Sequence, residues 1–244
     1  MPRGSDFEAR WTEGAWAELK LLESINDVPA LVAVQFGITD GTAFWSQADM
    51  DARNLPDQSQ HGKRPDILVF QRDDFTNSEV AELNELVLKS DNEAEELARR
   101  AVMAIESEFS PYAYKHRLEH YEKELSFTIK DEDLKPLVAW HDHFGVPLGI
   151  AQVYFDSAYF LSFGILLDGI KSGTIKRQIE RAYNKPVYYP KMSVGVPLGE
   201  FVESPTMAAD NILDRYGKYT PVRKVTGGKL RLSDDMKTIL MAKK

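Results

Sequence analysis

The chain has 244 residues, and its 43% hydrophobic content is enough for a sizeable core and excludes a disordered chain. It has no cysteine, which excludes disulfides, thiol nucleophiles and cysteine-based zinc sites. The formal net charge is -8, but it is unevenly spread. Residues 1–170 carry 15 Lys and Arg against 31 Asp and Glu, whereas residues 171–244 carry 15 against 7. An acidic catalytic part followed by a basic, DNA-contacting part would explain this, although an ordinary uneven surface would give the same counts.

The start of the chain, residues 1–6, lacks the apolar stretch of a signal peptide. No apolar run is long enough to span a bilayer. We therefore expect a cytoplasmic protein that does not act at a membrane.

The first elements are a helix and a strand. Trp16, Leu19, Leu22 and Ile25 recur at helical spacing and predict an amphipathic helix over residues 11–25. The apolar and β-branched residues that follow predict a strand over 30–36. Residues 37–60, rich in Gly, Asp, Asn, Pro and Ser, predict a loop.

Two acid-bearing strands come next, separated by helices. The first is predicted over 66–70 and the second over 102–109. Residues 77–100 between them predict two acidic helices broken near Ser90, the second capped by Asp91 or Asn92.

The rest of the chain continues the α/β pattern. It predicts a short strand at 127–129, a helix over 131–144 that Gly145 ends, and a doubly covered central strand over 146–155. We expect another helix over 157–170, then a mixed segment of Gly- and Pro-rich turns. No repeat or flexible linker divides the chain, so residues 1–244 are expected to form a single α/β domain with a central mixed sheet flanked by helices.

The chemistry is expected on the two acidic strands. Because side chains alternate along a strand, Glu106 and Glu108 share a face with Ala104, while Ile105 points the other way. Asp66 begins the earlier strand, and if the two strands are neighbours, Asp66 and Glu106 meet at one metal ion. Mg²⁺ prefers such oxygen ligands, and a bound divalent metal is how many enzymes cut phosphodiester bonds. Two solvated strand ends would be the plainer explanation of the same pattern.

Basic residues outside these strands are candidates for contact with DNA. Lys115 and Arg117 follow the second acidic strand, and Lys176, Arg177 and Arg181 have the spacing of a positive helical stripe. Arg223 and Lys224 lie among turns near the C-terminus, in what we expect to be loops that can enter a groove. A solvated face is an equal alternative for the helical stripe, and a packed pair of Tyr112 and Tyr114 is an equal alternative for the segment of Lys115 and Arg117.

Other polar residues favour structural roles. Glu13, Glu18 and Glu23 on the first helix are expected on a solvated polar face, although a carboxylate from such a helix can also join a metal site. His141 and His143 are two apart on a helix, so a metal pair is not expected. Asp156 is expected to cap the helix that follows it.

The order of the acidic motifs resembles the PD-(D/E)xK nuclease pattern: Pro65-Asp66, a spacer, then Glu106-Ser107-Glu108, with glutamate where lysine is usual, as in BamHI. Longer stretches resemble the AccI family of type II restriction endonucleases over roughly residues 62–200: 62–66, 108–112, 129–140, 145–156 and 196–200. The resemblance implies a restriction-endonuclease-like core, Mg²⁺, double-stranded DNA and a homodimer. It implies catalytic roles for Asp66, Glu106 and Glu108, with Asp66 and Glu106 as metal ligands and Glu108 as ligand or general base.

Two further functions stay open. Loss of the usual lysine suits a non-catalytic DNA-binding protein on a nuclease fold. A repair-type nuclease, which would cut without a fixed sequence, is the third possibility.

Overall fold

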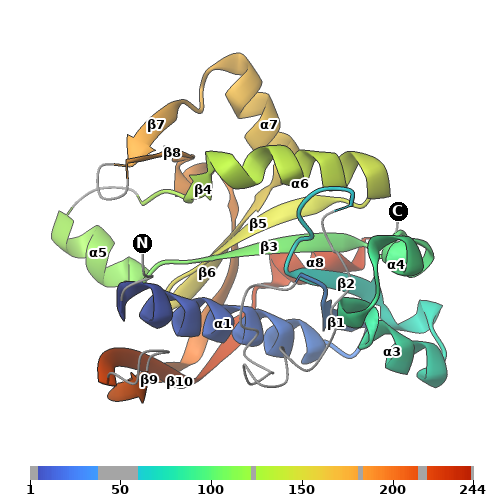
Figure 1. Cartoon of the computed structure of the whole chain (residues 1–244), viewed down its shortest axis with the longest axis horizontal. Helices are drawn as coiled ribbons and strands as arrows, with labels where there is room; N and C mark the ends of the chain where they lie inside the picture. The colour runs from blue at the N-terminus through green and yellow to red at the C-terminus, as the bar shows by residue number, and fades with distance from the viewer. Residues whose placement is uncertain (1–4, 38–59, 122–124, 181–183, 214–218, 243–244) are drawn as a thin grey trace.

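The computed structural model describes residues 5–37, 60–121, 125–180, 184–213 and 219–242. The predicted loop at 37–60 lies almost wholly outside them. A mixed seven-stranded sheet crosses the molecule (Figure 1). Its strands, in spatial order, are β1 (Leu31–Gln35), β2 (Ile67–Gln71), β3 (Met103–Phe109), β5 (Leu148–Val153), β6 (Ser157–Ser162), β9 (Val196–Leu213) and β10 (Tyr219–Leu232).

Only β3 and β5 are parallel neighbours in this sheet, and the other pairs are antiparallel. A smaller sheet joins β4 (Ile129–Lys130), β8 (Lys185–Tyr188) and β7 (Arg177–Glu180). The helices are α1 (Ser5–Asn26), α3 (Asn77–Leu83), α4 (Asp91–Ala98), α5 (Tyr114–Tyr121), α6 (Asp131–Phe144), α7 (Phe163–Ser172) and α8 (Asp234–Met241), with short 3₁₀ turns at Arg72–Asp74, Leu86–Leu88 and Met192–Val194.

Each face of the large sheet packs a core of its own. On one face Leu68, Ala104 and Ile150 pack with α6, α7 and the α3–α4 region. On the other face Ile105 and Ala151 pack with α1 and α8. Figure 1 shows α6 and α7 on one side of the sheet and α1 on the other. The predicted mixed sheet flanked by helices is therefore confirmed, as is the doubly covered strand β5, whose residues are all buried.

Three local predictions were wrong. Ser157–Ser162 is a strand, and α7 begins only at Phe163, because β6 pairs on both edges with β5 and β9. Ser90, rather than Asp91 or Asn92, caps α4: its side chain accepts from the backbone N–H of Glu93 in a capping box. Asp156 caps α5 rather than the next helix, because its carboxylate accepts the backbone N–H groups of Tyr114 and Lys115 at 2.7 and 2.8 Å.

The C-terminal segment also differs from the expected turns. It forms the long β9–β10 hairpin, whose register runs from Leu232↔Gly199 to Tyr219↔Leu213. The base of the hairpin packs on α1, where the Trp16 indole stacks on Phe201 and donates to the carbonyl of Gly227. The described part of the chain contains no helix long and apolar enough to cross a bilayer.

Candidate metal centre

The centre lies where β2 and β3 stop pairing. Their antiparallel ladder runs from Val69↔Met103 to Ile67↔Ile105, and Asp66 stands one residue beyond its end. The Oδ2 atom of Asp66 accepts the backbone N–H of Ser107 at 2.7 Å. The carboxylate thus takes a donor that a continued ladder would have paired, which fixes Asp66 beside Glu106. The two acidic strands, β2 and β3, are therefore neighbours in the sheet, as expected.

Alternation along β3 is as predicted. Ala104 belongs to the core under α6, whereas Met103 and Ile105 belong to the core under α1. Glu106 and Glu108 therefore project toward α6. Glu106 is 3% exposed, and the side chain of Glu108 is 15% exposed.

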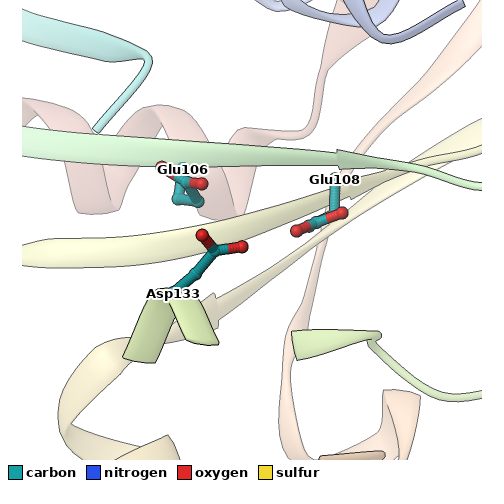
Figure 2. A group of neighbouring side chains, drawn as sticks. All are labelled: Glu106, Glu108 and Asp133. Atoms are coloured by element: carbon teal, nitrogen blue, oxygen red, sulfur yellow. The ribbon is translucent and has the colours of Figure 1, made fainter. Parts of the chain in front are cut away.

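A third carboxylate meets them from α6. Glu106, Glu108 and Asp133 each offer an oxygen, and these oxygens lie within 4.8 Å of one another. Figure 2 shows the two glutamates of β3 and Asp133 converging from opposite sides. We call these three residues the acid group. Asp133 was not predicted, although Asp131, Glu132 and Asp133 in one first helical turn are a visible cluster of acids.

Burial and mutual repulsion dominate the electrostatics. Burial raises the pKa of Asp66 well above its usual value, and Glu18 adds to the shift. Burial likewise raises the pKa of Glu106, and the Asp66 carboxylate adds to that shift. The Oε2 atom of Glu106 is buried and accepts no hydrogen bond from any described residue. Three close carboxylates, with a buried Glu106 oxygen that has no donor among the described residues, fit a hard divalent cation, which supplies compensating positive charge.

Glu18 also belongs to this environment, contrary to the expected solvated face. It is 7% exposed, and burial, with repulsion from Glu106, raises its pKa to about 7. Glu13 is 2% exposed, whereas Glu23 is exposed and pairs with Lys20 at 2.7 Å. The reason is packing of α1 against the sheet and the β9–β10 hairpin: among its described side chains, at residues 13–26, only Glu23 and Asn26 are exposed.

Glu18 gives a prediction for stability without metal. Because its pKa is raised in the fold, ionisation of Glu18 disfavours the folded state, and this penalty grows as the pH rises from about 4.5 to about 7. Glu18→Gln should therefore raise the unfolding free energy at pH 8 and change it little at pH 4. Urea unfolding in EDTA at both pH values measures this, with exposed Glu23→Gln as control. An equal effect of Glu18→Gln at the two pH values would contradict the assignment.

Family comparison decides what kind of protein carries this centre. The family model described as AccI restriction endonuclease matches residues 2–124, which is half of the chain. The chain belongs to the AccI restriction endonuclease family. This confirms the suspected family, but the match includes the first helix and stops before residue 129, so its extent differs from the expected 62–200.

Other comparisons add little. No curated protein matches the chain. Solved structures that match include Hjc, a Holliday junction resolvase from the archaeal hyperthermophile Archaeoglobus fulgidus, at 15% identity and a TM-score of 0.36. That match covers 76% of this chain and 91% of the resolvase chain, and such a likeness says nothing of function. Family membership supports a nuclease and a restriction-endonuclease-like core, and the matched residues include Asp66, Glu106 and Glu108.

Two lysines neutralise part of the acid group of this AccI family member. The Nζ atom of Lys63 forms ion pairs with Glu106 and, at 3.3 Å, with Asp133. The Nζ atom of Lys130 lies 3.1 Å from Glu108 and 3.7 Å from Asp133. Neither lysine was predicted. Lys115 instead forms an exposed ion pair with Glu200, with its Nζ atom 3.4 Å from the Oε1 atom of Glu200.

The prediction that Lys176, Arg177 and Arg181 form a positive stripe on a helix was wrong. Gly173 ends α7 in a left-handed conformation, and Arg177 begins strand β7, so helical spacing does not apply. Arg177 pairs with Asp131 at 2.9 Å, and Lys176 is exposed. Arg181 lies outside the described residues.

The remaining basic candidates lie on two elements. Lys224 is exposed on β10, which is a strand rather than the expected loop. Arg117 falls on α5 and Arg223 on β10, but their side chains lie outside the described part of the structure. His141 and His143 stay apart: His143 stacks on His61 at 3.6 Å, and His141 lies beside Asp142.

Proposed function

We propose that this protein is a type II restriction endonuclease that hydrolyses phosphodiester bonds of double-stranded DNA at a specific sequence with Mg²⁺. One observation carries the proposal: the acid group, in which one Glu106 oxygen accepts no hydrogen bond from a described residue, stands beside Asp66 in a member of the AccI family. Nucleases use such carboxylate sets to hold a divalent cation at the scissile phosphate.

The proposed metal ligands are Asp66 and Glu106, with Glu108 and Asp133 completing the oxygen set. A bound Mg²⁺ would polarise the phosphate and lower the pKa of a coordinated water. Two neighbouring residues position the carboxylates of this site. Ser107 orients Asp66 through its backbone N–H, and Lys130 holds the carboxylate of Glu108 at the rim of the acid group.

The proposed partner is duplex DNA, bound through basic residues away from the acid group. Exposed Lys115, Lys176 and Lys224 can contact phosphates, and Arg117, Arg177, Arg181 and Arg223 are proposed with them. We propose that the chain acts as one domain in the cytoplasm. We also propose that it works as a homodimer, because two sites related by a two-fold axis cut both strands of a palindrome.

Digestion of a long phage DNA tests this function. With Mg²⁺ we expect discrete fragments, and with EDTA uncut DNA, because the carboxylates have no cation to hold. A smear would favour the repair-type nuclease. Uncut DNA under both conditions, with retention in a gel shift, would favour the non-catalytic DNA-binding protein, which the change from lysine to Glu108 also suggests.

A further inference from the structure

The centre has four carboxylates, Asp66, Glu106, Glu108 and Asp133, and no lysine on β3, where Glu108 stands. We propose that Lys63, from the segment that precedes β2, is a catalytic residue and supplies the ammonium group that contacts the reacting phosphate. This inference rests on the proposed endonuclease function.

The position of the Lys63 ammonium carries the inference. Its Nζ atom pairs with Glu106 and Asp133, which belong to two different elements, β3 and α6. It also acts electrostatically on Asp66 and Glu18. The charge of Lys63 thus acts on both proposed metal ligands, Asp66 and Glu106. Lys130 pairs with Glu108 and Asp133 at the more exposed rim.

The backbone of Lys63 is anchored on both sides, as a catalytic group requires. Its own N–H donates to the carbonyl of Pro136 in α6 at 3.2 Å. Gly62 before it has φ +108°, and a Cβ atom there would lie 2.2 Å from the same carbonyl, so only glycine fits. Arg64 after it is buried and donates to the Asp91 carboxylate at 2.5 Å.

Lys63 lies where an ammonium group can donate hydrogen bonds, because its Nζ atom pairs with carboxylates from two elements. A fixed positive charge next to a phosphate stabilises the negative charge that develops on its oxygens.

The step itself is hydrolysis by water. A water oxygen forms a bond to phosphorus, and the bond between phosphorus and the leaving sugar oxygen breaks. The attacking water loses one proton to solvent, and the leaving oxygen gains one. Lys63 donates hydrogen bonds to a non-bridging phosphate oxygen and keeps its own proton.

The test compares Lys63→Met and Lys63→Arg with Lys130→Met, the matched lysine of the same centre. Three quantities are measured: single-turnover cleavage of duplex DNA with Mg²⁺, duplex binding with Ca²⁺, and Mn²⁺ binding to the free protein by calorimetry. For Lys63→Met we expect cleavage to fall about 100-fold or more, since removing one such donor typically costs that much. DNA binding should stay within about 3-fold, and Mn²⁺ should bind at least as tightly because a competing cation is gone.

Lys63→Arg should recover part of the rate, because it keeps the charge, and Lys130→Met should lose no more than about 10-fold. Three results would overturn the inference: cleavage by Lys63→Met close to wild type, an equal loss in Lys130→Met, or a loss of rate that follows a loss of Mn²⁺ binding or of thermal stability. If Lys63→Met fails to fold, the cleavage rate of Lys63→Arg is compared with that of Lys130→Met instead. A Lys63→Arg protein that cleaves no faster than Lys130→Met would also overturn the inference. Absence of cleavage by the wild-type protein would instead reject the proposed function.

Discussion

Asp66→Asn should abolish DNA cleavage while leaving the fold intact or more stable. The variant removes one negative charge from a place where Asp66 and Glu106 are both buried and where burial already disfavours ionisation. The asparagine oxygen can still accept the N–H of Ser107, so the end of the β2–β3 ladder is kept. Loss of a metal ligand that stabilises the transition state by several kcal/mol corresponds to a fall in rate of about 10³-fold or more.

Single-turnover cleavage, Mn²⁺ calorimetry and thermal melting in EDTA measure the effect of Asp66→Asn. Asp73→Asn is the matched control, because Asp73 is an exposed aspartate just past the other end of β2. Lost cleavage, weakened Mn²⁺ binding and an unchanged or higher melting temperature form the expected combination. Undiminished cutting by pure Asp66→Asn protein would reject the site, and a large drop in melting temperature would make Asp66 a structural residue.

Arg64→Met should cause a large loss of stability. Arg64 and Asp91 form an ion pair whose side chains are 2% and 0% exposed, and Arg64 also donates to the carbonyl of Lys89 at 2.8 Å. Methionine would leave the Asp91 carboxylate buried without its partner, which typically costs about 3–5 kcal/mol. We expect the urea midpoint to fall by more than about 1 M.

The control for Arg64→Met is Lys185→Met, which breaks the exposed pair with Glu132 and should cost under about 1 kcal/mol. The double variant Arg64→Met with Asp91→Leu removes both charges and should recover much of the loss. A double variant as unstable as the sum of its single variants would show that the pair itself is not the cause.

Residues near one another along a strand were predictable from the sequence, and residues joined by tertiary contacts were not. The alternation of Ala104, Glu106 and Glu108 gave the acidic face of β3 because strand geometry alone fixes it. The placement of Asp133 and Lys63 depends on how α6 and the segment before β2 pack against β3, and no periodicity encodes that. For Asp133, the acidic first turn of α6 suggested only a favourable helix start.

The errors have the same origin. The residues of β6 were assigned to the helix that follows them, but they pair with β5 and β9 on both edges and are held extended. Glu18 was expected in solvent because an amphipathic helix of this composition usually has one solvent-exposed face. Glu18 instead faces Glu106, Asp66 and Lys63, which are distant from it in sequence.

The order of the centre along the chain has a consequence for how such enzymes diversify. Glu18, Lys63, Asp66, Glu106, Glu108 and Asp133 all precede residue 134, so every residue of the proposed centre lies in the first 133 residues of the chain. The residues after them supply β7, β8 and the long β9–β10 hairpin, which lie outside the acid group. Under the proposed function, exchange of these C-terminal segments would change the surface offered to DNA without replacing any carboxylate of the centre.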